Sequence, residues 1–347
     1  MRPTGPAMQA EATQAPALVE PDGSKSTGLT SKPWWPWLKR GLTAAFFALV
    51  AYLLYTQARA IAWHEVLGAL REYPVTSLLA AVGLAATSLL LYSCFDLLGR
   101  HYTGHQLSAF KVLSVTFTSY VFNLNLGSLV GGVAFRYRLY TRLGLAYGTI
   151  TRILSLSMLT NWVGYVLLAG AVFSWRPLPL PPDWKIDGQG LQYLGFALLA
   201  VGVSYLGMCA FSKQRSFTLR GHELTLPSFR LALLQATMGV CNWLLISGII
   251  YVLLQQKVVF EVVVSVLLVA AVAGVITHVP AGLGVLEAVF VALLSHQVPK
   301  SSLLAALVAY RFIYYLGPLA VATALFLVTE TRAQRDQATP KIDDEPA

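Results

Sequence analysis

The chain of 347 residues is 56% hydrophobic, only 12% charged and carries a formal net charge of +9. Soluble globular proteins have about 25% charged residues, so this composition excludes the soluble classes and indicates a membrane protein with several spans. The pI of about 9.5 would also fit a nucleic-acid-binding protein, and the positions of the basic residues decide that alternative.

Residues 1–33 are polar and rich in Pro, Ala, Ser and Thr. No apolar run follows the initial Met1 and Arg2, so this stretch predicts a disordered cytoplasmic tail and no cleavable signal peptide.

Long apolar stretches follow the tail. A helix that crosses a bilayer needs about 20 apolar residues. Six stretches meet this requirement, at residues 41–60, 75–98, 147–173, 191–211, 231–254 and 303–328. They predict an all-α polytopic membrane protein with about six full spans.

Two further apolar stretches, 111–133 and 262–296, are each interrupted by a short glycine-rich break, at 123–136 and 278–287. Each stretch predicts a broken helical hairpin that enters and leaves the membrane on the same side, either by dipping into the membrane or by crossing it twice. Discontinuous helices at membrane depth are where many transporters bind their substrates, so the two breaks are the leading candidates for a site.

A proline-rich segment at 176–183 cannot continue a helix and divides the chain. We expect a membrane domain at 34–331, with halves at about 34–175 and 190–331, a periplasmic joint at 176–189 and a cytoplasmic tail at 332–347. Each half has two spans, a broken hairpin and a further span, with Arg152 and Arg311 in the helices after the hairpins. This order predicts an inverted-topology repeat.

The basic residues lie mostly in the segments that this topology places in the cytoplasm. The segments on that side hold Lys32, Lys39, Arg40, Arg100, Lys111, Arg136, Arg138, Arg142, Lys213, Arg215, Arg220, Arg230, Arg332, Arg335 and Lys341. The opposite side holds Arg59, Arg71, Arg176, Lys185, Lys257 and Lys300. This positive-inside bias predicts cytoplasmic termini and explains the basic pI without a nucleic-acid partner.

Arg311 is the leading candidate for a substrate-binding residue. A charge inside a span costs about 3 kcal/mol, so it normally faces a polar cavity or a protein interior. Tyr314 and Tyr315 share its helical face, and Gly317-Pro318 is expected to break the backbone one turn later. A guanidinium with nearby hydroxyls suits a phosphate. The alternative is an arginine that reaches the membrane surface or pairs structurally with an acid.

Three other charged residues each have more than one open interpretation. Arg152 either binds a phosphate like Arg311, pairs structurally with an acid or anchors its helix at the membrane surface. Glu287 follows the second break and either caps the restarted helix, pairs with a membrane arginine or takes up a proton. Asp96 lies four residues before Arg100, which favours an intrahelical ion pair, and is also a candidate substrate contact.

The residues of the two breaks have a packing interpretation and a binding interpretation. In the first break these residues are Asn123, Asn125, Gly127, Gly131 and Gly132, and in the second they are Pro280, Gly282 and Gly284. Either the glycines pack helices closely, or the freed amides and asparagines line a polar cavity for a lipid headgroup.

The last residue of the first break, Arg136, and the two arginines that follow it, Arg138 and Arg142, are expected at the cytoplasmic surface near anionic lipid.

Signals for catalysis or a cofactor are missing from the sequence. It has no phosphate-binding glycine loop with lysine, no zinc-binding helix motif and no nucleophile elbow. His101 and His105 are four apart but have no third ligand, and Cys94, Cys209 and Cys241 have no metal-site spacing. We therefore expect no metal, no cofactor and no enzyme activity.

Several runs together resemble a known family. They are 125–140 (NLGSLVGGVAFRYRLY), 151–154 (TRIL), 279–287 (VPAGLGVLE) and 310–318 (YRFIYYLGP). This pattern, within residues 34–331, resembles the lysylphosphatidylglycerol synthase transmembrane family, also called YbhN-like. In the multiple peptide resistance factor the region looks like the flippase half, joined to a soluble aminoacyl-transfer domain. Only a short charged tail follows residue 328 here, so the resemblance does not imply that transfer chemistry.

The resemblance implies an inner-membrane lipid flippase or translocase that binds an anionic or aminoacylated phospholipid, or a polyprenyl or hopanoid lipid. It also suggests that an acidic residue near Asp96 contributes to flipping. An alternative is a non-catalytic subunit that presents lipid to a separate lipid-modifying enzyme. A transporter for a soluble solute is a third hypothesis.

Overall fold

The computed structural model describes residues 73–175, 187–212, 216–219, 222–277 and 282–338, with side chains up to 328 except in 216–225, and the single positions 52, 68, 71, 178 and 180. The predicted span 41–60, the tail 1–33 and Pro280 lie outside the described residues, except for Tyr52. All elements below belong to one unit, residues 53–347.

The described part of the chain is almost entirely helical. Its elements are α3 (Val75–Ser93), α4 (Phe95–Thr103), α5 (Ala109–Leu126), the π-helix η2 (Ser128–Ala134), α6 (Phe135–Arg142), α7 (Tyr147–Trp175), α8 (Gly188–Phe211), β1 (Ser216–Leu219), β2 (His222–Thr225), α9 (Phe229–Leu253), α10 (Phe260–Thr277), α11 (Val285–Leu294), α12 (Lys300–Arg311), the π-helix η4 (Phe312–Leu316) and α13 (Gly317–Ala338). Besides the helices, the described residues hold a small antiparallel pair, β1–β2, with Ser216 opposite Thr225.

Six helical segments in the described residues are long and apolar enough to cross a membrane. They are Val75–Thr103, Tyr147–Trp175, Gly188–Phe211, Phe229–Leu253, Phe260–Thr277 and Lys300–Val328. Five of them coincide with predicted spans, which confirms the polytopic fold. The sixth is α10, the first arm of the predicted second hairpin, so this arm alone has the length of a crossing.

Short polar side chains set several helix starts. Ser108 accepts a hydrogen bond from the backbone N–H of Lys111 and so caps α5. Ser228 and Asp187 cap α9 and α8 in the same way. Each cap satisfies a backbone donor that the first turn leaves unpaired.

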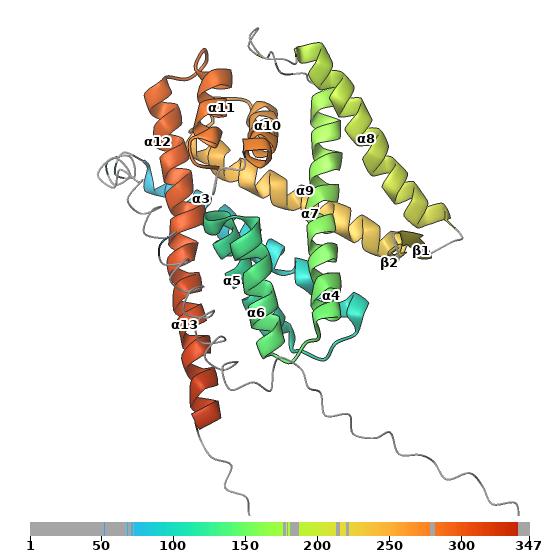
Figure 1. The fold of residues 1–347 in the computed structure, drawn as a ribbon. Coiled ribbons are helices and arrows are strands. Elements are labelled where there is room, and N and C mark those ends of the chain that lie inside the picture. The colour runs from blue at the N-terminus through green and yellow to red at the C-terminus, as the bar shows by residue number, and fades with distance from the viewer. Residues whose placement is uncertain are drawn as a thin grey trace, which may run out of the picture. The chain divides into compact units, whose positions relative to one another are not determined.

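Both predicted hairpins are present. After Gly127 the chain turns back, and η2 and α6 pack along α5. In the second half, α11 packs back along α10. Figure 1 shows α5–α6 in the lower part of the view and α10–α11 in the upper part, between α7 on one side and α12–α13 on the other. The two hairpins thus approach from opposite ends, as an inverted repeat predicts.

Helices α7 and α9 cross in very close contact (Figure 1). A Cβ added to Gly164 would lie 2.3 Å from the carbonyl carbon of Gly239, and one added to Gly239 would lie 2.4 Å from the carbonyl oxygen of Thr160. Small residues allow such a backbone approach in membrane helices. The crossing therefore joins the two halves of the chain backbone to backbone.

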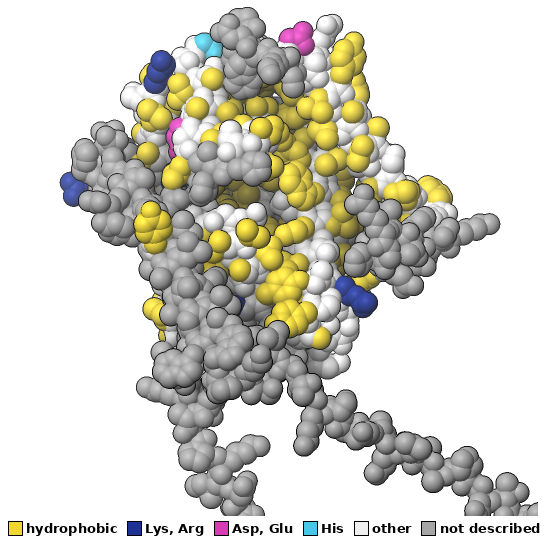
Figure 2. Space-filling view, in the orientation of Figure 1, with side chains coloured by type: hydrophobic (Ala, Val, Ile, Leu, Met, Phe, Trp, Pro, Cys, Tyr) yellow, Lys and Arg dark blue, Asp and Glu magenta, His cyan; other side chains and the backbone are white. Residues whose placement is uncertain are grey.

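The visible face of the unit is mainly apolar in its middle. Figure 2 shows hydrophobic side chains gathered there, while the charged side chains that are visible lie towards the edges. Large apolar side chains are exposed on α8, among them Tyr193, Phe196 and Phe211. A surface of this kind fits contact with lipid tails.

Candidate functional site

The two breaks line one cavity. Its volume is about 630 Å³, and its walls include Asn123 to Leu129 of the first hairpin, except Asn125, together with Gly274, Val275 and Gly282 of the second. The rest of the lining comes from α3, α5, α7, α9, α10, α11 and the α12–η4 segment. Segments that are about 150 residues apart in sequence therefore form opposite walls of the same space. Its volume lies within the range of ligand pockets.

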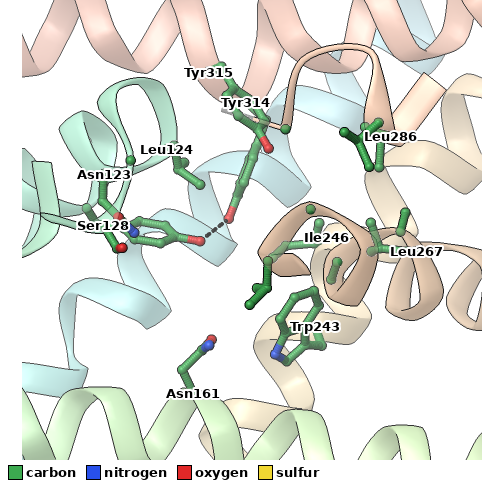
Figure 3. A pocket seen from close by; sticks show the side chains of 18 of the residues that line it. Asn123, Leu124, Ser128, Asn161, Trp243, Ile246, Leu267, Leu286, Tyr314 and Tyr315 are labelled. Carbon is green, nitrogen blue, oxygen red and sulfur yellow. Dashed lines mark hydrogen bonds between the residues drawn. The ribbon is translucent and has the colours of Figure 1, made fainter. Parts of the chain in front are cut away.

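The described residues that line this cavity are aromatic, polar or apolar, and none of them is charged. The aromatic residues are Tyr92, Tyr120, Trp243, Tyr310, Tyr314 and Tyr315. The polar ones are Asn123, Ser128 and Asn161. Figure 3 shows Asn161 pointing from α7 into the open space, with Trp243 beside it and the tyrosines across from it.

A chain of side-chain hydrogen bonds supports one wall of the cavity. Tyr314 is fully buried, and its hydroxyl lies 3.1 Å from the Tyr120 hydroxyl (Figure 3) and 2.9 Å from Ser88 Oγ. Ser88 donates in turn to Asn242 Oδ1 at 2.8 Å. This network joins α3, α5, α9 and η4, so the cavity wall is held by all four elements.

The glycines of the first break have two different structural functions, turning the chain and packing its two arms together. Gly127 has φ of +84°, and its added Cβ would meet nothing within 4 Å. It makes the turn at the cavity wall, since a left-handed backbone favours glycine. A Cβ on Gly131 would lie 2.2 Å from the carbonyl of Phe122, and one on Gly132 would lie 3.1 Å from Asn123 Oδ1. Those two glycines therefore pack the hairpin arms together.

In the second break, Gly282 and Gly284 also have positive φ values, +56° and +77°. Gly284 directly precedes α11 as its N-cap. As at Gly127, no atom lies within 4 Å of an added Cβ, so these glycines serve the turn rather than close packing.

The expected break at Gly317-Pro318 is wrong, because the helix continues from α12 through η4 into α13. Proline lacks an N–H, and its ring clashes with the carbonyl one turn earlier in a regular α-helix. The π turn at Phe312–Leu316 precedes this proline. It contains Tyr314 and Tyr315, both of which line the cavity, and π turns of this kind occur often at functional sites.

Arg311 is engaged beside the cavity and is not among its lining residues. Its Nε lies 2.5 Å from Glu287 Oε1, its Nη2 donates to Glu287 Oε2 at 3.1 Å, and the same Nη2 donates to the carbonyl of Gly282 at 3.0 Å. The guanidinium also lies over the Tyr315 ring, 5.5 Å from its centroid. One of the alternatives for Glu287, a pair with a membrane arginine, is thus what the structure contains.

A second buried ion pair lies in the first half. Arg136 Nε is 3.2 Å from Asp96 Oδ2, and Tyr140 donates its hydroxyl to the same oxygen at 2.9 Å. The expected position of Arg136 at the surface is therefore wrong, since its side chain is only 3% exposed. The expected pair of Asp96 with Arg100 is replaced by this contact, because α6 folds back and brings Arg136 to α4.

The other predicted residues take different positions. Asn123 lines the cavity, whereas Asn125 is buried beside it and donates to the backbone carbonyl of Tyr315 at 3.3 Å. Arg152 is exposed on α7 and is not among the lining residues. The structure therefore does not bring Arg152 and Arg311 to one site.

Several lining residues were not predicted as site residues. Four of them are aromatic residues within apolar stretches: Tyr92, Tyr120, Trp243 and Tyr310. In such a stretch the sequence does not distinguish an aromatic residue that lines a cavity from one that packs in the core. Asn161 is a polar residue in the middle of a long span, and this position is the one signal that would have identified it.

Comparison with known proteins gives consistent matches. The model of the family described as "Lysylphosphatidylglycerol synthase TM region" matches residues 42–322. The "Inner membrane protein YbhN" of Escherichia coli is 47% identical over 309 residues, which are 89% of this chain and 97% of that protein. A protein of Synechocystis sp., "Uncharacterized protein slr0712", is 30% identical over 300 residues, 85% of this chain and 93% of that protein.

More distant matches are longer proteins. The "Phosphatidylglycerol lysyltransferase" of Staphylococcus aureus is 25% identical over 300 residues, which are 83% of this chain but only 34% of that protein. The chain thus corresponds to about a third of the length of that relative.

Proposed function

Since the chain belongs to the lysylphosphatidylglycerol synthase transmembrane family, we propose that this multi-pass inner-membrane protein is a lipid translocase that admits a lipid headgroup to the cavity between its two broken hairpins. The acyl chains remain in the bilayer while the headgroup crosses through the protein. Both termini lie in the cytoplasm in this proposal, as the positive-inside bias predicts.

One observation carries the proposal: described residues of both breaks line one cavity, whose walls carry polar as well as apolar and aromatic side chains. Irregular backbone at membrane depth is tolerated where it is buried or lines a hydrated space. A headgroup is the part of a lipid that needs such a space. Because the hairpins approach from opposite ends, movement of either one would open the cavity towards a different leaflet.

The proposal does not require an arginine to bind phosphate. Arg311 is held by Glu287 and Gly282, so a phosphate would have to replace these contacts. In this proposal the Arg311–Glu287 pair holds the second break against α12. The Arg136–Asp96 pair holds the second arm of the first hairpin, α6, against α4.

A transport assay with the full chain in liposomes tests the proposal. Proteoliposomes that contain fluorescent lipids of several headgroup classes, phospholipids and glycolipids among them, should lose more signal to an impermeant quencher than empty vesicles do for at least one class. Val275→Trp fills the cavity and should reduce the rate at least about fivefold. Ile276→Trp is the matched control, since the neighbouring residue is exposed and is not part of the lining. Equal signals from proteoliposomes and empty vesicles, for lipids of every headgroup class tested, would reject translocation.

The second candidate is a subunit that presents lipid to a separate transferase. The Staphylococcus aureus relative favours it, because that protein is named a lysyltransferase and is about three times as long as the matched region. Transport by the purified chain alone would argue against this alternative. Lipid binding without transport, together with co-purification of a transferase, would support it.

A further inference from the structure

The chemistry of the cavity lining restricts the headgroup. The described lining contains no Lys, Arg, Asp or Glu, and it combines neutral hydrogen-bonding groups with six aromatic side chains. The nearest charges from the breaks are already paired, Arg311 with Glu287 and Arg136 with Asp96. Neither pair leaves a single unbalanced charge to neutralise a charged ligand.

The neutral groups lie on opposite walls. Asn161 projects from α7, Asn123 and Ser128 come from the first hairpin, and Trp243 comes from α9 (Figure 3). Amide groups both donate and accept hydrogen bonds, as does a serine hydroxyl. Such groups match the hydroxyls of a ligand, which also donate and accept.

Trp243 adds a second, independent observation. Its indole Nε1–H is buried and has no acceptor among the described residues, although Trp243 is one of the residues that line the cavity. A buried donor without an acceptor costs free energy, so such groups are normally paired. A ligand hydroxyl beside the indole would supply the missing acceptor.

From these observations we infer that the cavity takes an uncharged, hydroxyl-rich headgroup, namely the sugar of a glycolipid. This inference rests on the proposed function and names its substrate class. The apolar face of a sugar ring packs on aromatic rings, while its hydroxyls pair with Asn123, Asn161 and Trp243. A cavity of about 630 Å³ is larger than a glycerol group requires and has room for a sugar.

The same lining is unfavourable for the charged alternatives. A phosphate placed among these groups would lie in a low-dielectric site without a cation from the described lining, and an ammonium would lack a carboxylate. Aromatic rings alone attract cations, so a cationic headgroup is the strongest competitor and is included in the test.

Native mass spectrometry of the full chain in detergent tests the inference. Four lipids with identical acyl chains are added at equal concentration: glucosyl diacylglycerol, phosphatidylglycerol, lysyl-phosphatidylglycerol and diacylglycerol. We expect at least about fivefold more bound glucosyl lipid than any of the other three. Equal or stronger binding of phosphatidylglycerol or lysyl-phosphatidylglycerol would overturn the inference while leaving translocation possible.

Two variants locate the binding in the cavity. Trp243→Phe keeps the ring and removes the N–H, and Asn161→Leu removes the amide at similar volume. Each should weaken glucosyl-lipid binding about threefold to tenfold, the effect of one lost hydrogen bond, and leave diacylglycerol binding unchanged.

Trp175→Phe is the control, because Trp175 is 85% exposed at the end of α7 and is not among the lining residues. Unchanged glucosyl-lipid binding in both cavity variants would overturn the inference. A variant that fails to fold is recognised by its melting temperature, and Asn161→Ser then replaces Asn161→Leu.

Discussion

At the scale of single residues, the guanidinium of Arg311 contacts Glu287, Gly282 and Tyr315. It makes two contacts to one carboxylate, donates to the backbone of the second break and lies over an aromatic ring. A two-point contact between a guanidinium and a carboxylate fixes direction as well as distance. The side chain therefore fixes the position of α12 relative to the start of α11.

Removing one partner of this pair should be more harmful than removing both. The two side chains are 12% and 19% exposed, so a lone charge would remain largely desolvated. We expect Glu287→Gln to lower the free energy of unfolding by about 3 kcal/mol. The double variant Glu287→Gln with Arg311→Gln should recover part of this loss. Thermal unfolding in detergent measures both, and strictly additive losses would show that the two residues are not coupled.

At the scale of elements, the two hairpins reach the same cavity by different means. The two arms of the first hairpin pack closely at a glycine, because Gly131 lies against the backbone of Phe122. The second is held by an ion pair across to α12. The sequence pattern of short breaks with glycines predicted both hairpins, but it did not distinguish glycines that turn the chain from glycines that pack.

A methyl group at Gly131 should separate the arms of the first hairpin. Its Cβ would lie 2.2 Å from backbone atoms of Phe122, which cannot move as a flexible side chain can. We expect Gly131→Ala to cost at least about 2 kcal/mol of stability. Gly83→Ala in α3 is the control, since nothing lies within 4 Å of that position, and it should leave stability unchanged or slightly raised. Similar melting temperatures for both variants would contradict close packing at Gly131.

At the scale of the whole molecule, the distribution of basic residues predicts which end of each helix faces the cytoplasm. Arg142, at the end of the first hairpin, and Lys300, after the second, are both exposed and are predicted on opposite sides. In a variant without the native cysteines, Lys300→Cys should react with an impermeant maleimide on intact cells. Arg142→Cys should react only after the cells are permeabilised. The reverse pattern would place the termini outside.

Much of the fold was predictable, because apolar length alone marks a membrane helix. Five predicted spans and both hairpins have counterparts in the described residues. The pairing of charges was not predictable. Asp96 has Arg100 four residues away in its own helix, and only the return of α6 brings Arg136 to it instead. The tyrosines of the cavity were also not predictable. Tyr120 and Tyr310 are surrounded in the sequence by apolar residues, as a tyrosine packed in the core would be.

The contact between Gly164 and Gly239 limits how the two halves can move. Because backbone meets backbone at this crossing, α7 and α9 cannot approach further, and separating them would leave a gap that no side chain at either position fills. A large movement of one half of the chain relative to the other would then be a rotation of α7 against α9 about this contact. The parts farthest from it, including the outer ends of α7 and α9, would travel the greatest distance for a given rotation.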